Sequence, residues 1–215
     1  MKMAGASLLQ LVDVSISIGG KRLFEPLSVD VTGGDVTTLM GPSGCGKSTL
    51  LAFICGTLER SFSTSGRVIL NNSDVTDLPP EHRKIGILFQ DDLLFPHLNV
   101  AENLGFGLPR TLSRTERDSR IEMALRDADL EGFGNRDPGT LSGGQRARIA
   151  VMRTLLAQPH ALLLDEPFAK LDTQLRDKFR EFVFGHARKA AIPTLMVTHD
   201  DADARAAGGQ ILKMT

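Results

Sequence analysis

The segment from Gly41 to Ser48 carries the strongest chemical signal in the sequence. It reads GPSGCGKS, which matches GxxxxGK[ST], and it lies between a β-branched run at Val36–Met40 and a helical pattern at Thr49–Cys55. Glycines let the backbone curl so that successive N–H groups face a phosphate, and the positive end of the following helix dipole adds to the attraction. The residues predicted to bind nucleotide phosphates are Gly41, Pro42, Ser43, Gly44, Cys45, Gly46, Lys47, Ser48 and Thr49.

Two side chains of this loop have distinct predicted roles. The Lys47 ammonium would neutralise the β- and γ-phosphates, and the Ser48 hydroxyl would be a ligand of Mg²⁺. The alternative interpretation is a glycine-rich turn with a solvated lysine. The predicted strand before the loop and the predicted helix after it favour the phosphate site, because that site requires both.

An acidic pair follows a buried strand pattern later in the chain. Residues Ala161–Pro167 read ALLLDEP, so Asp165 and Glu166 stand at the end of an apolar run. Consecutive side chains of a strand point to opposite faces, so the two carboxylates are expected to have different tasks as long as strand geometry continues. Asp165 would be a partner of Mg²⁺ beside Ser48, and Glu166 a general base that polarises an attacking water. Taken alone, such a pair is more typical of a solvated turn.

A second anion-binding helix start is predicted at Leu141–Gln145, which reads LSGGQ. Ser142 is a suitable N-cap, and Gly143 and Gly144 leave backbone N–H groups accessible at the positive end of the helix that follows. One chain with two phosphate-binding helix starts requires an explanation. The order of these motifs resembles that of the ATP-binding cassette (ABC) ATPases, and the resemblance extends over essentially the whole chain.

The resemblance implies roles that residue chemistry alone does not supply. In ABC ATPases two cassettes pack head to tail, so Ser142–Gln145 of one subunit would cap the γ-phosphate of ATP held by the other. Gln90 resembles the family's lone glutamine, which contacts Mg²⁺ and relays to the membrane subunits. His199 in VTHD resembles the switch histidine that contacts the γ-phosphate, and Asp172 in AKLD matches the loop that crosses the dimer interface. Taken alone, Gln90 and His199 would be more typical of structural positions.

The stretch Leu88–Leu108 resembles more specifically the cassettes of bacterial importers for polyamines, thiamine, sulfate or ferric iron. This implies an ATPase that uses ATP and Mg²⁺ to power import through separate integral membrane permease subunits. A second copy of the chain would be a partner, and a periplasmic or extracellular solute-binding protein would act indirectly. The segment Phe95–Leu98 would lie where the coupling helix of the permease docks. The alternative is that Leu93–Phe95 is simply core of a helical subdomain.

The resemblance fails at the expected adenine contact. Importer cassettes usually have an aromatic residue at the end of the first strand, and this chain has Ile18 there. Stacking of a base on an aromatic ring is worth about 1–3 kcal/mol, so the replacement predicts weaker nucleotide affinity or relaxed base selectivity. Phe24 could compensate, but its position does not match. Two smaller departures, Ala147 after LSGGQ and Lys170 in AKLD, have no explanation in the sequence.

The elements that must position these residues follow from the hydrophobic pattern. Short β-branched runs alternate with longer helical patterns, which predicts an α/β fold: a P-loop NTPase core with a mostly parallel sheet, an N-terminal antiparallel β flap and an inserted α-helical subdomain. The flap is expected from Leu8–Ile18 and Leu27–Thr32, and the helical subdomain from about residue 91 to 159. The other strands are expected at Val36–Met40, Val68–Leu70, Ile85–Phe89, Ala161–Leu164 and Thr194–Val197. At 215 residues we expect one ABC ATPase domain without a C-terminal regulatory domain.

Composition and charge exclude several other classes. Lys+Arg number 25 and Asp+Glu 26, a net charge of -1, so no global positive field is available and no nucleic-acid partner is expected. The two cysteines, Cys45 and Cys55, fit neither a disulfide framework nor a metal spacing. No apolar run approaches the roughly 18 residues that span a bilayer, so with the resemblance we expect a peripheral protein on the cytoplasmic face of the inner membrane. The chain has no Trp and no Tyr, and its aromatic content rests on 11 Phe.

Two other functional classes compete with a transporter ATPase. A soluble ABC ATPase acting on DNA or ribosomes would normally need a long coiled-coil insertion or two linked cassettes, and the sequence has neither. A P-loop kinase that phosphorylates a metabolite would give LSGGQ no role. The sequence does not specify the transported substrate, and import rather than export rests on the resemblance around Gln90.

Overall fold

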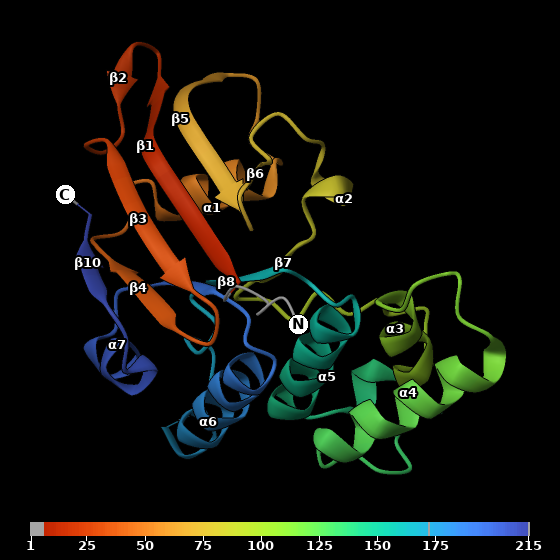
Figure 1. Ribbon diagram of the computed structural model, residues 1–215. Coiled ribbons are helices and arrows are strands. Elements are labelled where there is room, and N and C mark those ends of the chain that lie inside the picture. Colours follow the sequence, from red (N-terminus) through yellow and green to blue (C-terminus); the bar gives the residue numbers. More distant parts are fainter. Residues whose placement is uncertain (1–6, 172, 215) are drawn as a thin grey trace, which may run out of the picture. The chain divides into compact units, whose positions relative to one another are not determined.

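The computed structural model describes residues 7–171 and 173–214 (Figure 1). The chain forms two compact units, each described by itself below. Unit 1 contains the described residues of 7–87, 160–166 and 180–214, and unit 2 contains those of 88–159 and 167–179. The predicted α/β class is confirmed, because helices accompany a parallel and an antiparallel sheet.

Within the described residues, unit 1 contains two five-stranded sheets. The antiparallel sheet consists of β1 (Leu8–Ile18), β2 (Lys21–Arg22), β3 (Leu27–Thr32), β5 (Phe62–Leu70) and β6 (Ser73–Asp74). It has the order β2-β1-β5-β6, and β3 also pairs with β1. The second sheet, of order β10-β4-β9-β8-β7, consists of β4 (Val36–Met40), β7 (Ile85–Leu88), β8 (Ala161–Asp165), β9 (Thr194–Thr198) and β10 (Ile211–Lys213). Its pairs from β10 to β8 are parallel.

The helices divide between the two units. Those of unit 1 are α1 (Lys47–Cys55), α2 (Pro80–Arg83) and α7 (Asp201–Ala207). Those of unit 2 are α3 (Val100–Phe106), α4 (Arg114–Asp127) and α5 (Gly143–Leu156), with a 3-10 turn η1 (Pro138–Thr140) before α5. The long helix α6 (Thr173–Lys189) begins in unit 2 and ends in unit 1. No helix in the described part of the chain is both long and apolar enough to cross a membrane.

Strand β1 alternates buried and exposed side chains, but the alternation shifts by one residue at its centre. Leu11 is buried before the shift and Val14 after it. The cause is a bulge at Asp13, whose φ is 49°, where two residues of β1 oppose one of β5. Gly66 of β5 lies at this point with a φ of 90°, and a Cβ there would lie 2.4 Å from the Asp13 carbonyl oxygen. Only glycine therefore allows the two strands to pair here.

The strand predicted at Val68–Leu70 is longer than expected. It begins at Phe62 and pairs with β1 in antiparallel fashion along most of its length. Its first half, Ser63–Ser65, is polar and exposed, so hydrophobic periodicity gives no signal there. Pairing with β1 satisfies the backbone groups of this half and extends the strand to the end of β1.

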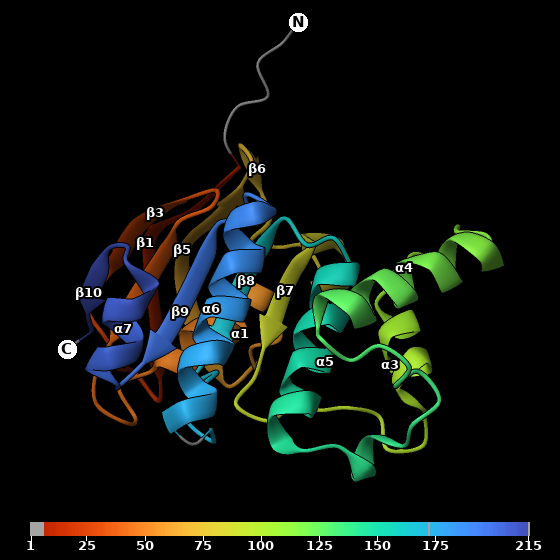
Figure 2. The same ribbon diagram turned by 90° about the horizontal axis from the view of Figure 1, so that it is seen from below.

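The core of unit 1 is shared by both sheets and α1. Leu50 and Ile54 of α1 are fully buried together with Leu11 of β1, Leu163 of β8 and Val197 of β9. Figure 2 shows the parallel strands between α7 on one side and the antiparallel sheet on the other. Burial on both faces explains why β8 and β9 are continuous apolar runs in the sequence.

The helices of unit 2 begin at well-formed N-caps. The side chains of Ser113 and Ser142 each accept a hydrogen bond from the backbone N–H of the residue three positions later. The side chain of that later residue in turn accepts a hydrogen bond from the backbone N–H of the serine. Asn99 does the same at α3. Within α3, the fully buried Asn103 side chain bonds the backbone N–H and carbonyl of Phe95 and thereby fixes the loop before the helix. The capping residues predicted for LSGGQ are therefore confirmed as a helix start.

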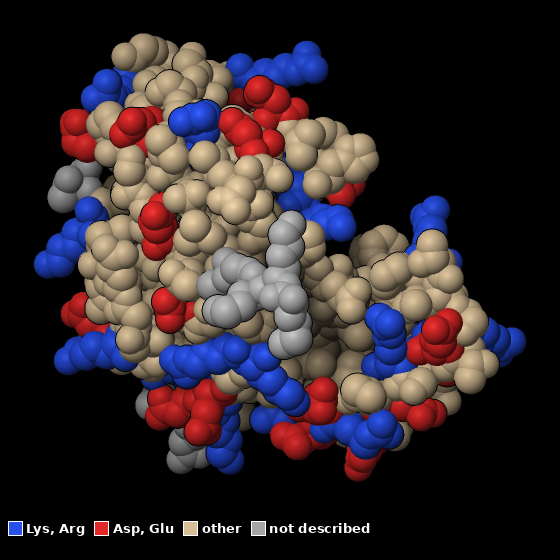
Figure 3. Space-filling view, in the orientation of Figure 1, with Lys and Arg blue, Asp and Glu red and all other residues tan. Residues whose placement is uncertain are grey.

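The charged side chains are mixed in sign. On the face drawn in Figure 3, Lys and Arg alternate with Asp and Glu, and neither sign forms a continuous field. This distribution agrees with the near-zero net charge of the sequence.

Candidate nucleotide site

Strand register brings three predicted segments to one edge of the parallel sheet. Met40, the last residue of β4, pairs with Thr198, the last residue of β9, and Asp165 at the end of β8 pairs with Val197. The carboxyl ends of three strands therefore coincide. The glycine-rich loop after β4, Glu166 after β8 and His199 after β9 emerge at this edge, which is where α/β sheets bind their ligands.

The loop from Gly41 to Gly46 has the conformation that its glycines predict. Gly44 and Gly46 have φ values of 83° and 95°, a region that other residues rarely adopt. A Cβ at Gly46 would also lie 3.0 Å from the ring of Phe24, so the loop rests directly on the core. The Lys47 ammonium bonds the carbonyl oxygens of Gly41 at 2.7 Å and Pro42 at 3.0 Å. It thereby closes the loop into a cradle, and an ammonium has a third N–H for a phosphate oxygen.

Ser48 and Asp165 form the candidate metal pair. The Ser48 hydroxyl donates to Oδ1 of Asp165 at 3.1 Å, although the two residues are far apart in the sequence. Burial raises the pKa of Asp165 above its usual value, and the neighbouring Glu166 carboxylate raises it further, while the Ser48 hydrogen bond and Lys47 oppose the shift. A hydroxyl and a carboxylate side by side are the oxygen ligands that Mg²⁺ prefers, so the donor set fits this ion.

Glu166 follows β8 directly in the sequence but is not part of that strand. Its φ is 47°, and β8 ends at Asp165, so the backbone turns sharply between the two acids. The Glu166 N–H still bonds the carbonyl of Val197 at 3.0 Å, which anchors the turn to β9. The two carboxylates are thus separated by a turn in the left-handed region. The alternation of side chains along a strand therefore does not apply to Glu166, because β8 ends at Asp165 and the backbone of Glu166 is left-handed.

The Glu166 carboxylate has two partners from the end of β9. Oε1 lies 2.8 Å from Nδ1 of His199, and Oε2 accepts a hydrogen bond from the hydroxyl of Thr198 at 3.2 Å. The His199 side chain is 63% exposed, whereas that of Glu166 is only 18% exposed. The imidazole therefore faces solvent while the carboxylate is held from both sides, which is the arrangement that a positioned general base requires.

A pocket of about 470 Å³ lies over the cradle. Its volume is within the roughly 300–1,000 Å³ of small-molecule sites. It is lined by Ile18, Leu23, Ser43, Gly44, Gly46, Lys47, Ser48, Thr49, Phe62 and Glu166. Ile18 thus lines the pocket, where the resemblance expects the base contact. Phe24 does not: it is 4% exposed and packs beneath the loop as a core residue, so it cannot compensate for the missing aromatic residue at position 18.

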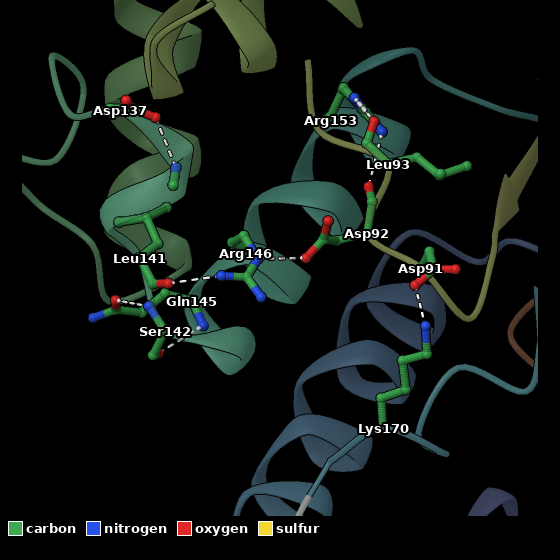
Figure 4. A network of polar contacts seen from close by, with 11 residues as sticks. Asp91, Asp92, Leu93, Asp137, Leu141, Ser142, Gln145, Arg146, Arg153 and Lys170 are labelled. Atoms are coloured by element: carbon green, nitrogen blue, oxygen red, sulfur yellow. Dashed lines mark hydrogen bonds and ion pairs between the residues drawn. The ribbon is translucent and has the colours of Figure 1, made fainter. Parts of the chain in front are cut away.

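In unit 2, the LSGGQ segment forms the predicted helix start. The Ser142 hydroxyl accepts a bond from the N–H of Gln145, and Oε1 of Gln145 accepts one from the N–H of Ser142 (Figure 4). Gly143 and Gly144 form the first turn, and Ser142 and Gly143 are exposed. The capping box therefore preorganises the segment, and the N–H groups of Gly143 and Gly144 lie at the positive end of a 14-residue helix.

Gln90 is exposed in unit 2 and lines a second pocket, of about 410 Å³. The two residues that follow it are held by cations: Asp91 by Lys170, and Asp92 by Arg146, whose Nε lies 2.8 Å from Oδ2 (Figure 4). Arg146 also donates to the carbonyl oxygen of Leu141 at 2.8 Å. Arg146 therefore joins the segment after Gln90 to the residue that precedes Ser142.

Both minor departures from the family pattern lie at this pocket. Lys170 and Ala147 line it, and Lys170 forms an ion pair with Asp91, which lines it too. A side chain larger than alanine at position 147 would take up part of this space. Asp172, the other residue singled out in AKLD, lies outside the described residues.

Sequence reasoning missed two residues that touch the candidate site. Thr198 is part of VTHD, but its contact with Glu166 depends on two strands that are distant in sequence. Phe62 stands in a polar stretch with no strand signal, and only its pairing with Ile18 brings it to the pocket. A signal for Phe62 did exist, since it is one of only 11 aromatic residues in a chain without Trp or Tyr.

A family model and two known proteins show what this chain is similar to. A family model described as ABC transporter matches residues 24–169. The "Uncharacterized ABC transporter ATP-binding protein YnjD" of Escherichia coli (strain K12) is 50% identical over 196 residues, which cover 91% of this chain and 90% of that protein. The "Fe(3+) ions import ATP-binding protein FbpC" of Pasteurella multocida (strain Pm70) is 38% identical over 213 residues, which cover 99% of this chain and 60% of that protein.

Proposed function

Since the chain belongs to the ABC transporter family and is an ATP-binding ATPase of that family, we propose that it powers the import of a solute through a separate membrane permease. The Pasteurella relative, which is named for import, supports this direction. The permease and an external solute-binding protein would select the solute. The chain would act at the cytoplasmic face of the inner membrane, bound to the permease.

The proposed hydrolysis uses the cluster at the carboxyl edge of the parallel sheet. Lys47 and the N–H groups of the loop would bind the ATP phosphates, and Ser48 and Asp165 would hold Mg²⁺, which would supply charge neutralisation there. Glu166 would accept a proton from the attacking water. His199, 2.8 Å from that carboxylate and exposed, would orient it and contact the γ-phosphate. Gln90 would contribute to the metal site and sense its occupancy.

The proposed cycle needs a second copy of the chain. Within Ser142–Gln145, Gly143 and Gly144 offer N–H groups at the capped start of α5, whereas the glycine-rich cradle of unit 1 precedes α1. ATP held by the cradle of one copy would be capped by Ser142–Gln145 of the other, so that binding closes the dimer and hydrolysis reopens it. This explains why one chain has two phosphate-binding helix starts.

An exposed apolar cluster in unit 2 supports a membrane protein as the partner. Phe106 is 68% exposed, and its ring centroid lies 4.6 Å from that of Phe95. Leu93 is 55% exposed, with a φ of 45° that turns the loop at this point. These residues follow Gln90 closely in the sequence. Because exposed apolar patches mark interaction sites, this cluster is the single observation that favours permease docking over simple packing.

Proteoliposomes test the import proposal. The permease that copurifies with the chain is reconstituted with the ATPase outside, and the solute and its binding protein are enclosed. ATP added outside should release the enclosed solute, and Phe106→Ser should abolish release while ATP hydrolysis by the isolated chain persists. Met123→Ser, a change at a 53% exposed side chain of α4, is the matched control. Uptake into the vesicles instead of release would contradict import.

A further inference from the structure

The pocket over the cradle has two chemically different walls. Gly46, Lys47 and Ser48 present N–H, ammonium and hydroxyl groups at one wall. Ile18 and Phe62, which are paired across β1 and β5, supply hydrocarbon side chains beside each other, and Leu23 adds a third next to Gly46. A nucleoside triphosphate has the same division, with an anionic chain at one end and a flat apolar-faced base at the other. The polar wall suits the phosphates and the apolar wall suits the base.

Phe62 reaches the pocket because of its place in the antiparallel sheet. It is the first residue of β5 and lies directly opposite Ile18, the last residue of β1. Side chains directly opposite in an antiparallel pair lie on the same face, so Ile18 and Phe62 stand next to each other on one wall. Phe62 is partly buried against the core, which holds the ring in place, and it is the one aromatic side chain among the described residues that line this pocket.

We infer that Phe62 is the aromatic contact for the base of the bound nucleotide and determines its affinity, with Ile18 and Leu23 completing the apolar wall. This inference rests on the proposed nucleotide site. β1 places the aliphatic side chain of Ile18 at this wall, and the neighbouring strand β5 places the ring of Phe62 beside it. The ring contributes base stacking, which alanine substitution removes at a cost of roughly five- to a hundredfold in affinity.

The chemistry of this wall also sets base selectivity. Strong discrimination between bases requires buried hydrogen-bonding groups that one base satisfies and another leaves unpaired. Ile18, Leu23 and Phe62 have no hydrogen-bonding side-chain atoms. Stacking accepts any base because every base has a π-face. The wall therefore contributes affinity for nucleotides of any base, and ATP and GTP should bind with similar strength.

The experiment compares a ligand that has a base with one that lacks it. The affinities of ATP, GTP and inorganic triphosphate are measured by calorimetry on the full chain. Phe62→Ala should weaken ATP and GTP by roughly five- to a hundredfold and leave triphosphate unchanged. Retained triphosphate binding also shows that the variant is folded, and Phe62→Leu keeps most of the packing volume while removing the ring. Phe133→Ala, at a partly buried ring in unit 2, is the control.

A rescue variant sharpens the test. Because positions 18 and 62 are directly opposite, the double variant Phe62→Ala with Ile18→Tyr returns a ring to the same wall and should restore ATP affinity. Wild-type ATP affinity in both Phe62 variants, or an equal loss of ATP and triphosphate, would overturn the inference. Lys47→Ala tests the nucleotide site separately from the role of Phe62. If Lys47→Ala binds ATP and triphosphate like the wild type, the proposed nucleotide site is wrong, whatever the result for the Phe62 variants.

Discussion

The hydroxyl of Thr198 lies 3.2 Å from Oε2 of Glu166 and donates its proton toward that carboxylate. The same hydroxyl lies 3.4 Å from Oδ2 of Asp203, a second carboxylate that is 2% exposed. Arg180 donates to the other oxygen of Asp203 through Nε at 2.7 Å. Because the guanidinium already neutralises Asp203, the single Thr198 proton is available to Glu166.

Thr198→Val should therefore slow ATP hydrolysis without weakening ATP binding. Valine has the same shape but no hydroxyl, so Glu166 loses the partner that fixes one of its oxygens. A hydrogen bond to a charged group is worth about 1.5–3 kcal/mol, which corresponds to a fall in kcat of roughly ten- to a hundredfold. Steady-state kinetics should show the loss in kcat with an unchanged KM, and Thr198→Ser should recover most of it. A serine variant as slow as the valine variant would indicate a packing effect.

Removal of the Arg83 side chain should destabilise unit 1 strongly. Arg83 is 6% exposed, and its guanidinium donates to the carbonyl oxygens of Phe53 and Ile54 at the end of α1, and to that of Leu78. Arg83→Met would remove these three bonds; the carbonyl of Phe53 would keep the N–H of Gly56 at 3.0 Å, whereas those of Ile54 and Leu78 would lose their Arg83 donor. The free energy of unfolding should therefore fall by about 3 kcal/mol. Urea unfolding measures this.

Arg60→Met is the control for Arg83, because Arg60 is exposed on the same unit. Its free energy of unfolding should change by less than about 0.5 kcal/mol. Equal effects of the two substitutions would show that the bonds of Arg83 to the end of α1 do not stabilise the fold.

The two cysteines should react very differently with a thiol reagent. Burial raises the pKa of the Cys55 thiol to about 11, with Arg83 opposing the shift, so at pH 8 only roughly one thiol in a thousand is ionised. Cys45 lies half-buried in the cradle. Labelling at pH 8 should modify Cys45 alone in the native protein and both cysteines in denaturant, and ATP should slow the reaction of Cys45. Rapid native labelling of Cys55 would mean that α1 opens.

Local chemistry in the sequence was sufficient for some parts of the site. Gly44 and Gly46 have the positive φ values that their motif requires, and Ser142 caps α5 as a serine before two glycines should. The apolar runs of β8 and β9 predict buried strands because both faces of the sheet are covered. Each of these properties depends on residues close together in the chain.

Other features depend on pairing between distant segments, so local sequence does not place them. The positive φ of Glu166 is maintained by its bond to Val197 of β9, and the bulge at Asp13 requires Gly66 on the neighbouring strand. Phe62 enters the pocket only because β5 extends along β1. The partner of Lys170, Asp91, is 79 residues away, so its charge could not be explained from the AKLD motif alone.

The central claim is that Glu166 completes an ATPase site that closes between two copies of the chain. Its most direct test is the oligomeric state of the Glu166→Gln variant. The molar mass in solution is measured by light scattering after size-exclusion chromatography, with and without Mg·ATP. Glutamine keeps the shape of the side chain but cannot accept the proton from water, so ATP should remain bound. We expect a stable dimer with Mg·ATP, a monomer without it, and no dimer when Lys47→Ala is added. A variant that stays monomeric with ATP bound, or that hydrolyses ATP at the wild-type rate, would contradict the central claim.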